Sequence, residues 1–415
     1  MVATTVFAGA HHAIHHVELL YDRDQEGGGR GIKLPVVIEW FVATGRDHPV
    51  WAVTWKTGEA VNPNGVDFDD YRMDTRGPYG SLNFDGAATR QEGDAIGGVS
   101  WGDFGLQFST TSSPLTMNSA FAYDTPNDVC FTRAWAANAN AEIGIVQTRT
   151  GDKEMGYPDR VFGRERGSTS ADAYPDKGDC TGLGDDRMYV MPCVAGWPYQ
   201  LMNFDWDPSA GKPLDEPTST KLIAWGSPYG WLGASSFDRF DYSGSADGRG
   251  DRSYATFIVL GPKCRFDPGS GACDRDGDVA LAIKAVTALA AARIDGVDPG
   301  SLVSRVPRGP GASQTKDIAN GYNDTYAAHF LRASNSAVAF TFTPADQQPV
   351  ANPIFAIQDY TVGHLPRITA GGKDLTVNTD AADCGAFVSL DAAANELWVT
   401  VHATVSQPLR VQVRP

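Results

Sequence analysis

Two turns of the sequence bring together side chains that can exchange protons or bind anions. The first turn, 43–49, presents an arginine, a carboxylate and an imidazole, and the second, 71–80, repeats this chemistry around a Gly-Pro pair. The residues concerned are Arg46, Asp47 and His48 in the first turn and Arg72, Asp74, Arg76 and Tyr79 in the second. Because loops held by a rigid sheet commonly carry binding and catalytic residues, both turns are candidate sites.

Aromatic residues gather in three later stretches of the chain, 192–200, 203–206 and 225–231. Flat indole and phenol rings beside Gly-Pro turns suit the C–H faces of sugar rings, while neighbouring polar side chains bind hydroxyl groups. With an earlier Trp-Gly-Asp segment, these stretches supply the candidate substrate-binding residues Trp101, Asp103, Trp197, Tyr199, Trp225, Tyr229, Trp231 and Asp238. The alternative is that these rings fill the core of a β-sandwich.

Two reactions on a sugar chain fit these residues. Hydrolysis of a glycosidic bond needs two carboxyl groups, about 5–5.5 Å apart for retention and about 6.5–9.5 Å apart for inversion. The candidates are Asp47, Asp74, Asp103, Asp205 and Asp238, with Glu39 if it faces the cleft. Elimination from a uronic acid instead needs a base, a group that holds the carboxylate, and an acid. The residues that suit these three roles are His48, Arg72 or Arg76, and Tyr79.

The residues of the two turns also have a purely structural interpretation. In that interpretation Arg46 pairs with Asp47 inside its own turn. Arg72, Asp74 and Arg76 would form an exposed ion-pair cluster, which contributes less than about 1 kcal/mol to stability.

Two patterns imitate metal sites without meeting their requirements. Four histidines lie between positions 11 and 16, but residues four apart on a strand are about 13 Å apart, so we expect polar strand residues near a sheet edge. Asp274, Asp276 and Asp278 imitate the start of a calcium loop, yet Val279 and Ala285 stand where that loop needs glycine and glutamate. The sequence therefore predicts no metal site and no cofactor.

Composition excludes several classes of partner. The chain has 415 residues and a formal net charge of −16, and nucleic acids and anionic membranes attract proteins with a positive field instead. No segment approaches the ~20 apolar residues of a membrane span. The N-terminus lacks the basic and apolar segments of a signal peptide.

Six cysteines indicate disulfides and hence an oxidising compartment, because none of their spacings is that of a metal knuckle. The expected pairs are Cys264 with Cys273, Cys180 with Cys193, and Cys130 with Cys384. We therefore expect a secreted or periplasmic protein whose signal peptide has been removed.

Apolar periodicity predicts many strands and few helices. The even-numbered residues of 32–42 are all apolar, and Trp51, Val53 and Trp55 alternate with smaller or polar residues, which is typical of strands. Other expected strands are 13–21, 99–104, 106–108, 120–123, 129–135, 143–148, 337–342, 354–360, 386–390, 397–403 and 409–413, with a turn at 370–373. Helices are expected at 279–293, capped by Asp278, and at 323–333. The polar stretch 149–186 lacks such a pattern and is interpreted as a lid.

The predicted fold is mainly β: a large antiparallel β-sandwich with one or two helices. We expect a main domain, 1–345, with embedded helices near 279–294 and 323–333. The C-terminal β segment, 346–415, is either the last sheet of the same sandwich or a small appended domain.

The stretch Trp40 to Trp55, with its Gly-Arg-Asp-His-Pro turn, and the aromatic turn 225–231 resemble the β-supersandwich of galactose-mutarotase-like proteins. That fold recurs in several polysaccharide lyases and hydrolases. The resemblance is one of pattern over roughly the first two thirds of the chain, and it assigns no individual catalytic residue. What it implies is a carbohydrate ligand on a concave sheet.

These observations predict a secreted carbohydrate-active enzyme that cleaves glycosidic bonds. Hydrolysis is favoured because the acidic surface disfavours a polyanionic substrate and aspartates outnumber plausible bases. One alternative is a polysaccharide lyase that acts by β-elimination on a uronic-acid polymer. Another is a module that binds glycans or protein partners without chemistry.

Overall fold

The computed structural model of the chain describes two sets of residues. Backbone and most side chains are described for 2–22, 33–56, 129, 131–136, 139–150, 252–267, 269–307, 315–318, 320–379 and 384–415. The backbone alone is described for the strands at 81–83, 96–102, 195–197, 199–204, 206–207, 212–213 and 221–227. Within the described residues no helix is both long and apolar enough to cross a membrane.

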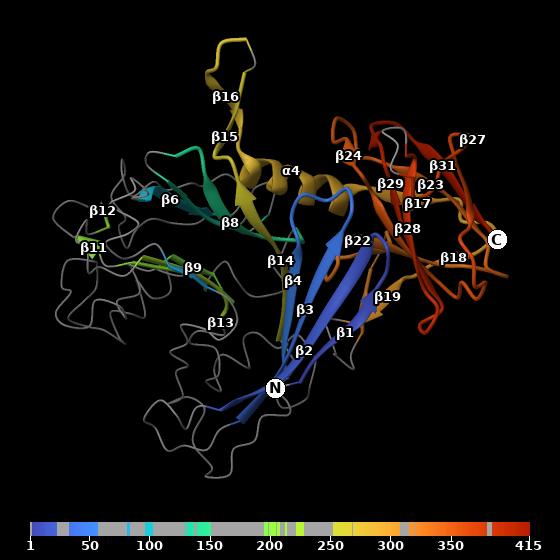
Figure 1. Cartoon of the computed structure of the whole chain (residues 1–415), viewed down its shortest axis with the longest axis horizontal. Coiled ribbons are helices and arrows are strands. Elements are labelled where there is room, and N and C mark those ends of the chain that lie inside the picture. The colour runs from blue at the N-terminus through green and yellow to red at the C-terminus, as the bar shows by residue number, and fades with distance from the viewer. Residues whose placement is uncertain are drawn as a thin grey trace.

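The N-terminal part of the chain builds an eight-stranded sheet in which every neighbouring pair is antiparallel. It lies at the centre and left of Figure 1, with its first four strands in blue. In sheet order the strands are β1 (Val2–Ala8), β2 (His12–Asp22), β3 (Lys33–Ala43), β4 (Val50–Trp55), β14 (Arg252–Gly261), β8 (Glu142–Gln147), β7 (Phe131–Ala136) and β6 (Ile96–Gly102).

Both faces of this sheet are buried at its centre, although the sequence pattern indicated burial of one. Phe41 and Val50 are cross-strand partners that belong to the core shared with the C-terminal part of the chain. Ile38 and Val53 are cross-strand partners on the other face, and both are also buried. Trp51 lies on that second face and is fully buried, so this indole is part of the interior.

The C-terminal part forms a second body in which two sheets pack face to face. One sheet is β17 (Arg293–Asp295), β23 (Val338–Thr343), β31 (Leu409–Arg414), β26 (Arg367–Ala370) and β27 (Lys373–Asp374). The other is β18 (Ser301–Leu302), β22 (Ala328–Arg332), β25 (Ile354–Gln358), β29 (Glu396–Val401) and β28 (Ala386–Asp391), with β21 (Tyr322–Asn323) paired to β22. We refer to these two sheets as the C-terminal sandwich. The fold class is thus mainly β, as predicted.

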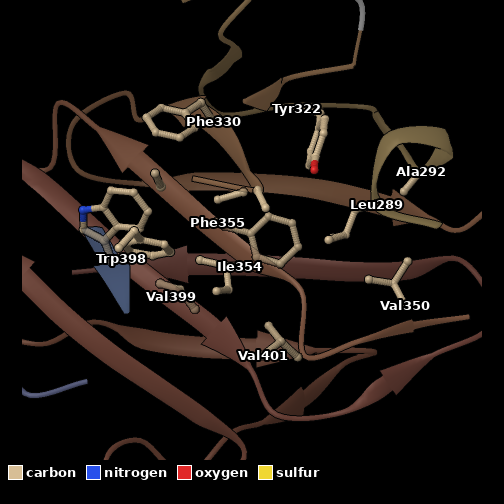
Figure 2. Packing of buried hydrophobic residues seen from close by; sticks show 14 of the residues in the cluster. Leu289, Ala292, Tyr322, Phe330, Val350, Ile354, Phe355, Trp398, Val399 and Val401 are labelled. Atoms are coloured by element: carbon tan, nitrogen blue, oxygen red, sulfur yellow. The ribbon is translucent and has the colours of Figure 1, made fainter. Parts of the chain in front are cut away.

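Aromatic side chains fill the space between the two sheets of the C-terminal sandwich. Phe340 on β23 and Phe355 on β25 have ring centroids 4.8 Å apart, and Phe342 packs edge-on to Phe355 at 5.4 Å. Figure 2 shows Phe355 and Ile354 inside this cluster, with Leu289 of the helix at its margin. In each sheet a strand from 293–343 pairs directly with a strand from 354–414, β23 with β31 and β22 with β25, so the C-terminal 70 residues share their sheets with the preceding segment.

Five smaller sheets complete the strands described. One has four strands, β5 (Ser81–Asn83), β13 (Lys221–Ser227), β10 (Tyr199–Phe204) and β9 (Ala195–Trp197). The others are pairs: β11 (Trp206–Asp207) with β12 (Lys212–Pro213), β15 (Cys264–Phe266) with β16 (Cys273–Asp276), β19 (Arg305–Pro307) with β20 (Thr315–Asp317), and β24 (Val350–Ala351) with β30 (Thr404–Val405). The β15–β16 ribbon projects from the body in Figure 1.

The helix expected near 279–293 is present as α4 (Asp278–Ala291) and bridges the two bodies in Figure 1. Its N-cap residue is Gly277, so no side chain at the N-cap accepts a hydrogen bond from the helix. Asp278 is the first helical residue. The buried carboxylate of Glu142 on β8 instead accepts the Val279 N–H at 2.8 Å. A residue from the neighbouring sheet therefore supplies the acceptor that the sequence had assigned to Asp278.

The prediction of a second helix at 323–333 is wrong, because this segment forms the end of β21, a turn and β22. The Asn323 side chain accepts the N–H of Thr325, and Ala327 has a positive φ of 48°, which ends any helical path. The first four residues of β22 are buried, and three of them pair in parallel with β25. Burial on both sides erases the two-residue alternation that marks a half-buried strand.

His12 joins the first sheet to the C-terminal sandwich. Its ring nitrogens lie 3.0 Å from Ser389 Oγ and 2.8 Å from Thr400 Oγ1, and the residue is buried. Gly9 lets this contact form, since a Cβ there would lie 2.4 Å from Cβ of Ser389. The expectation of polar histidines near a sheet edge is thus wrong for His12, because β1 forms the edge and the sandwich covers β2.

One of the three expected cysteine pairs is contradicted, and the other two stay predictions. Cys264 is disulfide-bonded. Cys384 is a free and buried thiol, so the expected bridge between Cys130 and Cys384 is not formed. The side chains of Cys130, Cys180, Cys193 and Cys273 lie outside the described residues.

Acid should destabilise the junction at His12. Burial, with the nearby charges of His11 and Arg46, lowers the pKa of His12 to about 3 from 6.5. A lowered histidine pKa gives stability that is complete above the unfolded value and is lost as the pH falls below 6.5. When the pH falls from 7 to 5, we expect the free energy of unfolding to decrease by about 2 kcal/mol because of His12.

Urea unfolding of the wild type and of His12→Gln at the two pH values measures how much of the stability loss is due to His12. The variant should lose less stability on acidification than the wild type, and His364→Gln, at an exposed site, should behave like the wild type. An unchanged pH dependence in His12→Gln contradicts the assignment.

Candidate functional site

A cavity of about 630 Å3 opens between the β3–β4 turn, α4 and the segment that precedes and enters β24. One wall is the face of α4 that includes Leu281, Ala285 and Ala288. Leu281 is a large apolar side chain that remains 41% exposed. The rest of the lining includes most of the polar side chains, Arg46, Asp47, His48, Gln347, Gln348 and Asn352, beside the apolar Phe257, Pro349, Val350 and Ala351. The cavity therefore combines apolar surface with a few polar groups, as small-molecule sites commonly do.

The β3–β4 turn keeps its shape through two contacts. Gly45 has a positive φ of 87°, a conformation that favours glycine, and a Cβ there would lie 3.3 Å from Cγ2 of Thr400. The Asn352 side chain donates a hydrogen bond to the Gly45 carbonyl at 2.7 Å. These contacts fix the turn against the C-terminal sandwich, so Asp47 and His48 are presented from a rigid support.

Arg46 anchors the turn rather than pairing with Asp47. Its two terminal nitrogens donate to the carbonyls of Tyr326 and Ala327 at 2.8 and 2.7 Å, and its guanidinium lies 6.0 Å from the Phe41 ring and 5.5 Å from the Phe257 ring. Burial lowers the pKa of Arg46 to about 10, against a smaller raising effect of Tyr322. Arg46 therefore stays charged at neutral pH.

His48 is a largely buried imidazole whose Nε2 lies 3.9 Å from Oδ2 of Asp278. Burial lowers the pKa of His48, and Arg265 lowers it further, whereas Asp278 and Asp47 raise it. The net shift is downward, so the imidazole is neutral at pH 7. A neutral imidazole with a carboxylate behind it is able to accept a proton and to hold the resulting charge.

Asp278 is held behind His48 from three directions. The Arg265 guanidinium donates to its Oδ1, His48 faces its Oδ2, and Gly261 of β14 lies against the carboxylate. A Cβ at position 261 would lie 2.0 Å from Asp278 Oδ2. Asp278 was singled out in the sequence as a helix cap, and its placement against His48 depends on the packing of α4 on β8 and β14.

Of the predicted catalytic residues, Asp47 and His48 lie on the cavity wall. Arg72, Asp74, Arg76 and Tyr79 are outside the described residues, as are the predicted binding residues Asp103, Tyr229, Trp231 and Asp238 and the carboxyl candidate Asp205. The expected lid at 149–186 lies outside them except for its first two residues. Glu39 is buried, and the cavity lining does not include it.

Four predicted binding residues lie on strands of which the backbone is described. Trp101 is on β6, at the edge of the eight-stranded sheet, and Tyr199 is on β10. Trp197 on β9 and Trp225 on β13 both pair with Gln200 of β10, so the three positions form one row across the four-stranded sheet.

The amide groups of the cavity were not predicted from the sequence. Gln347, Gln348 and Asn352 lie just before β24 or next to it, in a polar segment without periodicity or motif. Only their approach to the β3–β4 turn makes them part of the site. Among the described residues, no group of three or more histidine, cysteine, aspartate or glutamate side chains is arranged to hold a metal ion.

No protein-family model, curated protein or solved structure matches this chain.

Substitution of Gly261 tests whether Asp278 controls His48. In Gly261→Ala the new methyl group displaces the Asp278 carboxylate, and overpacking of this kind costs about 1–3 kcal/mol. His48 then loses a neighbour that raises its pKa, so its pKa should fall further. Denaturant unfolding measures the first effect and an NMR titration of His48 the second.

Gly363→Ala is the matched control, since nothing lies within 4 Å of a Cβ at that position. It should leave both quantities unchanged. Equal stability of the two variants, with the same His48 titration, contradicts the proposed contact.

Proposed function

We propose that the cavity binds a carbohydrate and that His48 is the general base that acts on it. The observation that carries this proposal is a neutral imidazole on a cavity wall, with a buried carboxylate 3.9 Å behind it. Asp47 and the amides of Gln347, Gln348 and Asn352 share that wall. They supply donors and acceptors for hydroxyl groups, while the apolar face of α4 suits the C–H face of a sugar ring.

The residues of the cavity favour elimination over hydrolysis. Hydrolysis by the usual route needs two carboxyl groups on either side of the bond, and Asp47 is the one carboxylate among the described residues of the cavity lining. Asp278 stands behind His48, where Arg265 already binds it. Elimination needs a base that is neutral near pH 7, a description that fits His48.

In this reaction His48 takes the proton from C5 of a uronic acid unit. The electron pair of the C–H bond forms the C4–C5 double bond, and the bond from C4 to the glycosidic oxygen breaks. The imidazolium then returns its proton to the departing oxygen, which balances the step. The amides of the cavity would hold the uronate carboxylate, whose charge increases during proton removal. Lys284 also lines the cavity, with its ammonium group paired to Asp276.

A binding module without chemistry is the second candidate. The distance of 3.9 Å between His48 and Asp278 exceeds that of a hydrogen bond, and Arg265 competes for the same carboxylate. An imidazole held this loosely suits the recognition of a ligand as well as its conversion. Hydrolysis at carboxyl groups outside the described residues stays a prediction from the sequence.

Secretion or a periplasmic location is part of the proposal. The disulfide at Cys264 supports it, because disulfides persist in oxidising compartments. The net charge of −16 is compatible with a uronic-acid polymer only if cations near the binding site offset the repulsion locally.

A screen of uronic-acid and neutral polysaccharides separates the candidates, since elimination leaves an unsaturated product that absorbs in the ultraviolet. We expect absorbance with a uronic-acid polymer and a loss of roughly 10²–10⁴-fold in rate for His48→Gln. The rate should fall as the pH drops and His48 becomes protonated. His364→Gln, at an exposed histidine, should retain the wild-type rate.

Three other outcomes decide against elimination with His48 as the base. New reducing ends without absorbance indicate hydrolysis. Binding of a glycan without either signal, retained in His48→Gln, indicates the binding module. Full activity of His48→Gln removes His48 from the chemistry.

A further inference from the structure

A chain of ionisable side chains outside the cavity ties the turn 323–327 of the C-terminal sandwich to the first sheet. The Tyr326 hydroxyl donates to Oε2 of Glu39 at 2.5 Å, and Oε1 of Glu39 lies 2.9 Å from Nδ1 of His16. Nε2 of His16 lies 3.2 Å from Oε1 of Glu18. The chain runs from Glu18, whose side chain is 65% exposed, to Glu39, which is 10% exposed.

Glu396 of β29 approaches the same tyrosine from the sandwich. It precedes Trp398 by two positions, so both residues are on one face of the strand, and the Trp398 ring packs edge-on to Tyr326 at 5.6 Å. Burial raises the pKa of Glu396 to about 7. The nearby Asp391 also raises the pKa, whereas the polar groups of Trp398 and Gln358 lower it.

Other charged groups face this contact from each neighbouring element. Glu18 and His16 belong to β2, Glu39 to β3 and Asp391 to β28. Negative charges predominate, and burial together with Glu39 and Glu396 raises the pKa of Tyr326 well above its usual value. The cations are protonated His16 and Arg46, which binds the Tyr326 carbonyl.

We propose that His16, Glu39, Tyr326 and Glu396 form an acid-stabilised clasp. The clasp holds the turn 323–327 on the first sheet at mildly acidic pH and loosens as the pH rises through neutrality. Protonated Glu396 adds no charge to an already negative junction, and protonated His16 compensates Glu39 and Glu18. Loss of either proton leaves uncompensated negative charge between the two bodies.

The direction of the pH dependence follows from the pKa shifts of Glu396 and His16. The folded pKa of Glu396 lies above its usual 4.5, so the stability that its proton gives is lost as the pH rises from 4.5 through 7. Burial alone would lower the pKa of His16, but hydrogen bonds to Glu39 and Glu18 raise it overall. Its contribution is complete below 6.5 and is lost as the pH rises through the raised value. Both groups act in the same direction.

Arg46 connects the clasp to the cavity. Its guanidinium binds the carbonyls of Tyr326 and Ala327, and the residue also lines the cavity. When the clasp loosens, Arg46 loses its fixed partners, and the β3–β4 turn loses one of its supports. The pH of the surroundings would thus control how well the cavity is formed, whatever ligand it takes.

Hydrogen exchange of the full-length chain tests the clasp at its own site. Buried His12, His48 and His329 have lowered pKa values and oppose the clasp below pH 6.5, so global unfolding would mix the two effects. Exchange in peptides that cover 322–331, corrected for the intrinsic rate, gives the local opening constant. Comparison with Glu396→Gln at each pH isolates the carboxyl group.

We expect the ratio of the wild-type opening constant to that of Glu396→Gln to rise between pH 5 and pH 7.5, on the order of tenfold to fiftyfold. Asp374→Asn, at an exposed carboxylate paired with Arg367, should keep the wild-type pH dependence. A ratio that does not change with pH, or that falls as the pH rises, overturns the clasp.

His16→Gln provides a second and independent reading, at a side chain that is nearer the surface than Glu396. It should open more readily than the wild type below pH 6.5 and show a smaller rise with pH. If His16→Gln keeps both the wild-type opening constant and its pH dependence, His16 is not part of the clasp and the proposal fails.

Discussion

The packing of Phe41 against the aromatic rings of the C-terminal sandwich is the contact on which the arrangement of the two bodies depends. The Phe41 ring lies 4.8 Å from that of Trp398 and 5.6 Å from that of Tyr326. Truncation of a buried phenylalanine or tryptophan typically costs about 3–5 kcal/mol, a large part of the stability of a domain. Because Phe41 belongs to β3, this contact also sets the position of the β3–β4 turn, and with it the cavity wall.

Burial of this junction explains the unusual protonation states around it. Arg46 satisfies its charge with two carbonyls and two aromatic faces, His12 is neutral between two hydroxyl groups, and His48 is neutral in front of Asp278. In each case loss of water disfavours the charged form. The surface between the bodies therefore contains the ionisable groups of the cavity and of the clasp, and Arg46 is common to both.

For the candidate site, the sequence identified the β3–β4 turn. Asp47 and His48 were recognisable because an acid and an imidazole stand side by side in a short turn between two predicted strands. Asp278 was recognised only as a helix cap. The amides of Gln347, Gln348 and Asn352 were not recognised, because they lie far along the chain and carry no motif. The structural interpretation paired Arg46 with its neighbour Asp47, yet Arg46 binds carbonyls of a turn that the sequence placed in a helix.

The sequence by itself determined the β class, the strands at the start and end of the chain, and α4, because these follow from side-chain periodicity within one element. Tertiary structure decided what local patterns cannot encode. Within 323–333, β22 is a strand because β25 pairs with it. Glu142 of β8 accepts the helix N–H that Asp278 was expected to cap. His12 is buried because the C-terminal sandwich covers β2. Each outcome depends on a partner distant in sequence, whose contribution outweighs the local preference of the segment.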